Sequence, residues 1–233
     1  MATPVTGASV RVQVNLPENL VVRSMTTEDK EEVAALFAKT FQREPLGAYA
    51  GVQISEGRWV AGQALKDPVS FVVEDKTLAG PNRLVAFRTS SILTKAKLEK
   101  EKSSEEEPPS PVSAILNRMS EIWELSTTVF ETNPNAKVMK FIALGVDDAY
   151  EGLGLAKVLL NVSLDKARFT GCEAVVVIAS AFATQHLFKN RYEFELKGQV
   201  RYADFTMKQG NEEVQPFVNL TEPEFLQVYE KRI

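Results

Sequence analysis

The chain is poor in the residue types that most often build metal sites and disulfides. Its 233 residues include one cysteine, Cys172, and one histidine, His186. One residue of each type cannot complete a structural zinc site, so the sequence predicts no metal centre. A lone cysteine also cannot close an internal disulfide, which points to a reducing compartment.

Long apolar runs and an excess of positive charge are also missing. No apolar stretch reaches the roughly 18 residues of a membrane-spanning helix, and the first residues lack the pattern of a secretion signal. Lys and Arg total 27 against 31 Asp and Glu, a formal net charge of −4, so no overall positive field favours nucleic acid. We therefore expect a cytoplasmic protein that binds neither membrane nor nucleic acid.

What the chain does contain is enough apolar material for a core. With 44% hydrophobic and 25% charged residues, it fits one large domain better than two. Residues 1–19 show no sustained periodicity, so we expect a poorly structured N-terminal segment before a single domain over 20–233. The tract 95–111, KAKLEKEKSSEEEPPSP, has almost no apolar residues and is predicted to be a flexible charged insertion.

Apolar spacing predicts alternating strands and helices along this domain. Thr26 and Asp29 form a capping-box pattern ahead of a helix that Glu44-Pro45 is expected to end. The segment 225–233 fits a strand or a terminal helix, and we favour the strand. Strands are expected at 20–23, 70–74, 84–92, 137–146, 174–179 and 194–207, and helices after residue 26, from 112, from 155 and at 182–190. The segments from 137 to 179 make a β-α-β unit.

The segment DDAYEGLGLA, residues 147–156, joins strand to helix in this unit. A helix that starts after a glycine-bearing turn leaves its first N–H groups unpaired at the positive end of its dipole, an arrangement suited to phosphate. Taken alone, a Gly-x-Gly turn is more often an ordinary tight turn. It is not a P-loop, because Gly-Lys-Ser/Thr is missing, nor a dinucleotide fingerprint, because Lys157 replaces the third glycine.

In its context this segment resembles the acetyl-CoA-binding core of the GNAT superfamily of N-acetyltransferases. In that family a turn of the form Q/R-x-x-G-x-G/A binds the pyrophosphate, and here Glu151, Gly154 and Ala156 hold the signature positions. The stretches FQREPLGAYAGV, ASAFATQHLF and VRYADF are most similar to the insect-type arylalkylamine N-acetyltransferases. The resemblance implies an α/β (α+β) fold with a mixed, mostly antiparallel twisted sheet and helices on both faces. It also implies direct acetyl transfer from acetyl-CoA to a small primary amine.

The resemblance assigns roles to residues of this chain. Glu44, in the EPL segment, corresponds to the family's glutamate base, and Ser180 and Thr184 correspond to two hydroxyl positions near the leaving thiolate. The same side chains also fit ordinary roles, as a solvated carboxylate and as helix caps. The co-substrate is expected on the backbone of the strand end and the turn, at Leu144, Gly145, Val146, Glu151, Gly152, Leu153, Gly154, Leu155 and Ala156.

Two positions depart from the family pattern. Glu151 stands where the family usually has Arg or Gln, and a like charge about 4 Å from a phosphate costs a few kcal/mol in partly screened surroundings. Arg191 stands near a family glycine. These departures support a rival reading, a catalytically silent GNAT-like domain that binds a partner protein. Polyamines and protein amines are alternative acceptors, and the sequence does not choose between a monomer and a homodimer.

Overall fold

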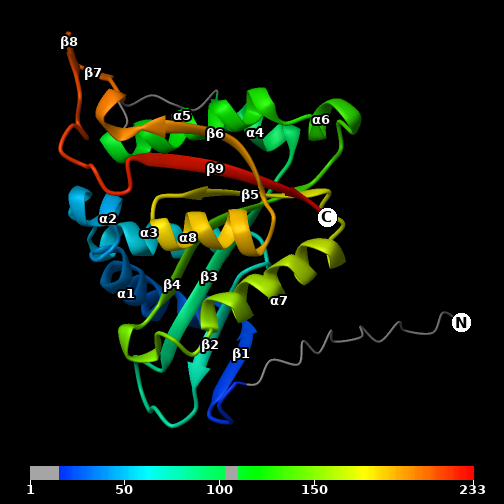
Figure 1. Cartoon of the computed structure of the whole chain (residues 1–233). Coiled ribbons are helices and arrows are strands. Elements are labelled where there is room, and N and C mark those ends of the chain that lie inside the picture. The colour runs from blue at the N-terminus through cyan, green and yellow to red at the C-terminus, as the bar shows by residue number, and fades with distance from the viewer. Residues whose placement is uncertain (1–15, 103–109) are drawn as a thin grey trace, which may run out of the picture.

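A seven-stranded sheet forms the centre of the molecule (Figure 1). The computed structural model describes residues 16–102 and 110–233. The strands of the sheet are β1 (Leu20–Ser24), β2 (Phe71–Asp75), β3 (Leu84–Leu93), β4 (Val138–Val146), β5 (Ala174–Ala179), β6 (Glu195–Arg201) and β9 (Phe225–Arg232). Their order is β1-β2-β3-β4-β5-β9-β6, and every neighbouring pair is antiparallel except β4 and β5. The mixed, mostly antiparallel sheet that was expected is therefore confirmed.

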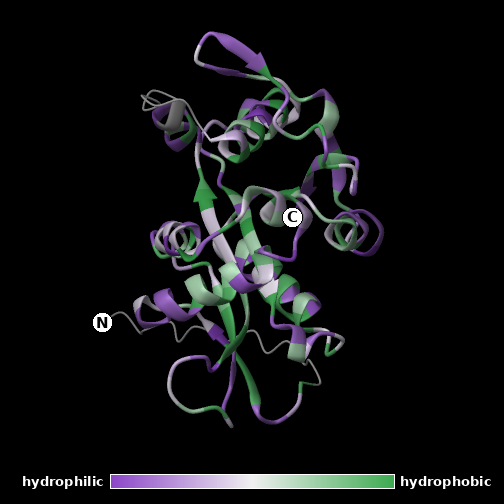
Figure 2. Cartoon of the chain, turned by 90° about the vertical axis from the view of Figure 1, so that its left-hand side faces the viewer, coloured by the Kyte–Doolittle hydropathy of each residue, from purple (hydrophilic) through white to green (hydrophobic). Residues whose placement is uncertain are grey.

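Helices cover both faces of this sheet. The helices α1 (Lys30–Phe41), α3 (Ile54–Ala64) and α5 (Pro111–Ser126) lie on one face, and α7 (Leu155–Phe169) lies on the other. The alternation of side chains along β3 divides them, because Phe87 packs with Phe37 of α1, whereas Ala86 packs with Leu159 of α7. Figure 2 shows that the hydrophobic residues are concentrated in the strands between these layers.

Shorter elements join these layers. They are η1 (Thr27–Asp29), α2 (Pro45–Ala50), α4 (Lys95–Lys102), α6 (Val129–Thr132), η2 (Asp148–Tyr150), α8 (Phe182–His186), the π-helical η3 (Leu187–Arg191), η4 (Tyr202–Asp204) and the hairpin of β7 (Met207–Gln209) and β8 (Glu212–Val214). No helix in the described ranges is long and apolar enough to cross a membrane.

Several sequence predictions are confirmed in detail. The N–H of Thr26 donates to the carboxylate of Asp29 at 2.8 Å, which completes the capping box before α1. The β-α-β unit is present as β4, α7 and β5. The C-terminal segment forms a strand because it pairs on both sides, with β5 and with β6.

Three predictions need correction, and one of them is the strand expected at 194–207, which ends at Arg201 before η4 and β7. The tract 95–111 is not a loop throughout, since residues 95–102 form α4 and α5 begins at Pro111; residues 103–109 lie outside the described residues. Leu98 anchors this helix, because its side chain is buried in the same cluster as Trp123. Pro45 does not end the first helix. That helix stops at Phe41, and Pro45 opens α2 at a position where a missing N–H costs nothing.

A buried carboxylate fixes the entry to α1. Asp29 is fully buried and accepts hydrogen bonds from both terminal nitrogens of Arg23 at 2.7 Å. The Nε of Arg23 also donates to Glu74 at 2.7 Å, so the arginine links β1, β2 and the start of α1. Burial acts to raise the pKa of Asp29, but the hydrogen bonds from Arg23 and Thr26 together lower it below its ordinary value.

The substitution Asp29→Asn tests this linkage. A carboxyl group with a depressed folded-state pKa stabilises the protein above its unfolded pKa of about 4, and the contribution is lost as the pH falls through the folded pKa. We expect Asp29→Asn to lower the free energy of unfolding by about 2 kcal/mol at pH 7, and by much less near pH 3. Urea unfolding at the two pH values measures the difference, and an equal loss at both would contradict the prediction.

Candidate functional site

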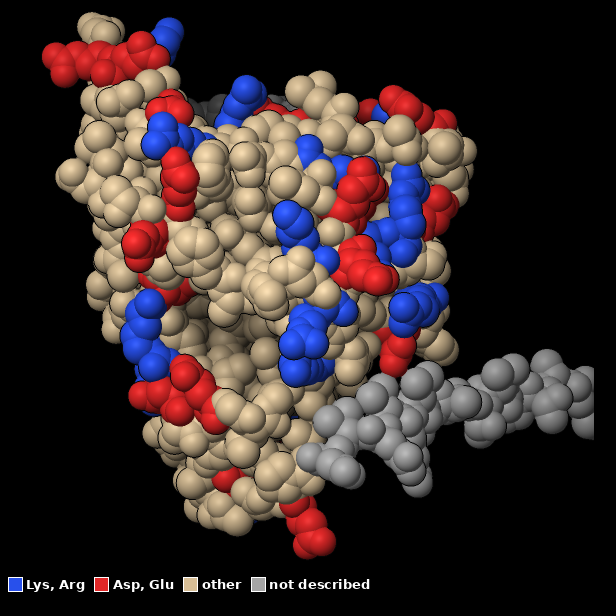
Figure 3. All heavy atoms as spheres, viewed as in Figure 1, with Lys and Arg blue, Asp and Glu red and all other residues tan. Residues whose placement is uncertain are grey.

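The parallel strands β4 and β5 separate before they end. Residues 138–141 of β4 pair with residues 174–177 of β5, and the pairing stops there. Among the described residues, the rest of β4 pairs only with β3, and the rest of β5 pairs only with β9. The edge of β4 from 142 to 146 therefore faces a gap. Figure 3 shows the surface hollowed at this place, between α8 and the start of α7.

A β-bulge accounts for the separation. Thr89 of β3 pairs with Ala143 and Ser90 pairs with Phe141, so Ile142 is an extra residue on β4. A bulge bends its strand and increases the local twist. Because Ile142 directly follows the last β4 residue that pairs with β5, the bend falls where the two strands part.

The turn between β4 and α7 presents free N–H groups at the end of this gap. Gly152 and Gly154 have φ values of 80° and 76°, which favour glycine, and Gly154 caps α7. No described residue accepts a hydrogen bond from the N–H groups of residues 152–156. The predicted turn is therefore open to an anion. Space does not require glycine at either position, since a Cβ would meet nothing within 4 Å. The positive φ angles are therefore the reason for the two glycines.

The carboxylates around this turn are paired with two cations from the end of α1. Lys39 contacts Asp147 and Asp148 at 2.8 Å each, and these hydrogen bonds raise the pKa of Lys39. Arg43 lies 3.7 Å from Asp148 and 3.5 Å from the carboxylate of Glu151. The Glu151 side chain is exposed and turned toward Arg43, so its charge is partly balanced within the protein.

The end of β4 before the turn is closely packed on the face that α1 covers. A Cβ at Gly145 would collide with the ring of Phe87 and would lie 2.7 Å from the Thr40 hydroxyl. Gly145 is therefore needed because two side chains approach its backbone. Leu144 and Val146 point to the opposite face, where both join the cluster around Leu155 and Leu159 of α7.

Glu44 occupies the N-cap of α2. Its Oε2 accepts a hydrogen bond from the N–H of Gly47 at 2.7 Å, which fixes the carboxylate. Its second oxygen, Oε1, is enclosed and has no hydrogen-bond partner in the described parts of the chain. The carboxylate is thus neither solvated nor fully paired, which differs from the ordinary role of a solvated surface carboxylate.

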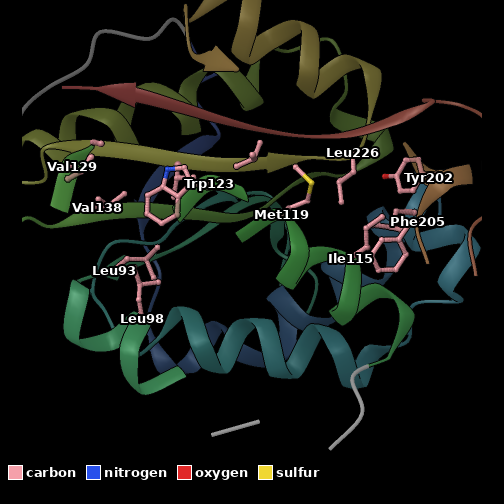
Figure 4. Packing of buried hydrophobic residues seen from close by; sticks show 14 of the residues in the cluster. Leu93, Leu98, Ile115, Met119, Trp123, Val129, Val138, Tyr202, Phe205 and Leu226 are labelled. Carbon is pink, nitrogen blue, oxygen red and sulfur yellow. The ribbon is translucent and has the colours of Figure 1, made fainter. Parts of the chain in front are cut away.

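Tyr202 is a candidate that sequence reasoning did not identify, although it noted VRYADF as a motif. Tyr202 is fully buried, and its hydroxyl also has no hydrogen-bond partner within 16–102 and 110–233. Burial raises its pKa, and the negative charge of Glu44 raises it further, which indicates that the two groups lie near each other. Figure 4 shows Tyr202 and Phe205 beside Ile115, at the end of the cluster opposite Trp123.

The two predicted hydroxyls stand at the end of β5. Ser180 is half-buried and directly follows the strand, so it lies beside the gap. Thr184 lies in α8 and donates a hydrogen bond to the carbonyl of Ala181 at 2.8 Å. The Thr184 hydroxyl therefore has a local partner already, whereas the Ser180 hydroxyl forms no hydrogen bond with the described residues.

A cavity of about 660 Å³ lies between α5 and the sheet, on the same face as Tyr202. Its apolar side includes Trp123, Val176 and Ile178, and its rim includes Ser120 and Glu121 of α5. Because Ile178 stands two residues before Ser180, the cavity reaches the end of β5 where the gap opens. Its volume lies within the range of small-molecule sites.

The remaining reactive side chains have structural or surface positions. Cys172 is buried, and burial raises the pKa of its thiol. His186 is exposed and its Nδ1 lies 2.9 Å from the side-chain amide of Asn190. No group of three His, Cys, Asp or Glu side chains that could hold a metal occurs in the part of the chain that the structure describes.

No protein-family model matches this sequence, and no curated protein matches it by sequence. Solved structures do match. Arylalkylamine N-acetyltransferase 2 from Aedes aegypti is 20% identical with a TM-score of 0.72, over 93% of this chain and 100% of that one. The polyamine N-acetyltransferase of Drosophila melanogaster, described as forming N-acetylagmatine, is 18% identical with a TM-score of 0.69, over 92% and 100%. Arabidopsis thaliana Naa50, bound to a bisubstrate analogue containing CoA, is 13% identical with a TM-score of 0.52, over 92% and 99%. The chain has the GNAT fold, as expected.

The close packing at Gly145 gives a direct prediction. Gly145→Ala places a methyl group against the Phe87 ring, so we expect it to lower the free energy of unfolding by about 2 kcal/mol. Adding Phe87→Leu makes room and should recover part of that loss in the double variant. Gly62→Ala in α3 is the control, since its Cβ would meet only Lys30 at 3.9 Å, and it should be neutral or stabilising. Urea unfolding of the four variants measures this, and additive losses in the double variant would contradict it.

Proposed function

We propose that this protein is an acetyl-CoA-dependent N-acetyltransferase that acts on a small primary amine of the arylalkylamine type. The observation that carries the proposal is the gap between β4 and β5. It has a turn with free N–H groups on the side of α7, and on the opposite face it has the half-paired carboxylate of Glu44. A donor and an acceptor can therefore approach the same place from two sides.

The donor side fits acetyl-CoA through backbone groups. The N–H groups of residues 152–156 would hold the pyrophosphate at the start of α7, and the unpaired edge of β4 would pair with the amides of the pantetheine arm. When bound, acetyl-CoA supplies the acetyl group as a thioester. The ion pair of Glu151 with Arg43 at 3.5 Å partly neutralises this carboxylate and so reduces its repulsion of the pyrophosphate.

The acceptor side fits a primary amine. An amine with a pKa near 10 must lose a proton before it attacks the thioester carbon, and we assign the acceptance of that proton to Glu44. The Gly47 N–H holds Oε2 of this carboxylate, which leaves Oε1 free to face the amine or a bridging water. A backbone N–H on the unpaired edge of β4, residues 142–146, would stabilise charge on the thioester oxygen. Ser180, rather than Thr184, has the free hydroxyl to give the leaving thiolate a proton.

Aromatic side chains near Glu44 favour an arylalkylamine. Phe217 lies 5.6 to 5.9 Å from the rings of Tyr49, Tyr202 and Phe205, and Tyr49 is 43% exposed. The cavity under α5 lies on this same face and offers room for the organic part of the amine. The solved structures named for arylalkylamines and for N-acetylagmatine support small amines as a class, and polyamines are the second candidate.

Calorimetric titration with acetyl-CoA tests the donor site. We expect binding in the micromolar range that weakens at high salt, because the pyrophosphate is charged. Glu151→Gln should tighten binding about twofold to fivefold at low salt, with a smaller gain at high salt, because this carboxylate is exposed. No detectable binding at millimolar acetyl-CoA would contradict the proposal and would favour the rival reading of a silent protein-binding domain.

The substitution Glu44→Gln tests the base. It keeps the shape of the side chain but cannot accept the proton, so we expect turnover at neutral pH to fall about a hundredfold. The acetyl-CoA dissociation constant should not change. Glu31→Gln on the exposed face of α1 is the matched control and should leave both quantities unchanged. Thiol release measured across pH gives the rates, and a variant with the pH profile of the wild type would exclude Glu44 as the base.

A further inference from the structure

An unpaired arginine is buried where β4 and β5 part. Arg88 lies on β3, opposite Leu144 of β4, and only 2% of it is exposed. Its guanidinium carbon lies 3.8 Å from the ring centre of Phe141 and 5.9 Å from that of Phe188 in η3. Because Phe141 is the last β4 residue that pairs with β5, the guanidinium lies at the closed end of the gap, on the face of α7.

The hydrogen-bonding capacity of Arg88 is unused. Its Nε and Nη2 are enclosed and have no acceptor among the described residues, and Nη1 is the guanidinium nitrogen that is not enclosed. A guanidinium carries five N–H donors and no acceptor, and buried polar groups in folded proteins are nearly always paired. Burial lowers the pKa of Arg88 to about 9, the expected response of a desolvated cation.

Two further groups on the same face are also unpaired. The hydroxyl of Ser90, two residues along β3 from Arg88, is enclosed and has no partner in the described part of the chain, and the same holds for Ser163 in the helix that covers this face. A cation and two hydroxyls without partners in one layer indicate a polar ligand that is not part of the described chain.

The shape of the site narrows the kind of ligand. Phe141 covers one flat face of the guanidinium, so the N–H groups along its edge are the ones left to bond, and their natural partners are oxygen atoms. The ligand must also satisfy the unpaired N–H and C=O groups of the β4 edge, which calls for an extended chain with secondary amides. No acidic side chain is needed if amide carbonyl oxygens supply the acceptors.

We propose that Arg88 is a binding residue for the acyl donor, and that it donates hydrogen bonds to the carbonyl oxygens of the pantetheine arm at the closed end of the gap. This inference rests on the proposed function. Nη1 is the atom that meets the arm first. The wall that carries Phe188 is a π-helical turn, a type of turn that is common at functional sites.

The substitution Arg88→Met separates a binding role from a structural one, because the two roles predict opposite changes in stability. Met removes a buried unpaired charge and keeps an apolar stem, so we expect the melting temperature of the free protein to rise by roughly 3 °C or more. Binding of acetyl-CoA should weaken by about tenfold to a hundredfold. An Arg88 that serves only packing would give a lower melting temperature, so an unstable or unfolded Arg88→Met protein overturns the proposal.

Three probes show which part of the donor Arg88 contacts. Calorimetry or competition should show weaker binding of acetyl-CoA and S-acetylpantetheine to Arg88→Met, and unchanged binding of adenosine 3′,5′-bisphosphate, which lacks the arm. Arg88→Lys keeps the positive charge but loses the planar set of guanidinium N–H donors. It should bind acetyl-CoA and S-acetylpantetheine with intermediate affinity. The matched control is Arg168→Met on the exposed side of α7, which should bind all three probes as the wild type does.

The results distinguish this inference from the function on which it rests. Wild-type protein that fails to bind acetyl-CoA overturns the proposed function, and the Arg88 assignment with it. Wild-type protein that binds, while Arg88→Met binds equally well, overturns the Arg88 assignment alone. Equally weakened binding of all three probes also overturns the Arg88 assignment, because Arg88 would then not act on the pantetheine arm specifically.

Discussion

The separation of β4 from β5 is the constraint on which the rest of the site depends. The extra residue Ile142 bends β4 just after its last pair with β5, and the two strands then follow different neighbours. This single irregularity leaves a strand edge unpaired inside the sheet rather than at its border. Such an edge is normally costly, because its N–H and C=O groups lack partners, so its presence at the centre of the fold is best explained by a ligand.

The two faces of the sheet give the gap two different environments. On the side of α7 lie a turn with free N–H groups and the unpaired Arg88. On the side of α5 lie Glu44, Tyr202 and a cavity with apolar walls. Backbone N–H groups on one side and a carboxylate with aromatic side chains on the other are the two environments that the proposed acyl transfer to an amine requires. The enclosed unpaired groups lower the stability of the free protein, as is common where function requires groups to await a ligand.

Much of the fold and part of the site could be predicted from the sequence. Periodicity located most strands and long helices, and the cap at Thr26 was correct in detail because capping involves residues three apart. The glycine turn could be predicted because a backbone with positive φ strongly favours glycine over other residues. The helix α4 was missed because its buried residue Leu98 stands between charged residues along the chain. The pairing of Glu151 with Arg43 was also missed, since its partner lies 108 residues away in the sequence.

The sequence by itself determined the local features: most of the segments that become strands or helices, where the turn before α7 lies, and that neither an internal disulfide nor a two-cysteine metal site can form. These depend on residues close together in the chain. Only the tertiary structure decided that Glu44 is half-paired, that Tyr202 lies near it, and that Arg88 is buried without a partner among residues 16–102 and 110–233. Such properties depend on which groups from distant segments enclose a side chain and which of them offer it a hydrogen bond. Local sequence patterns do not show which distant segments come together.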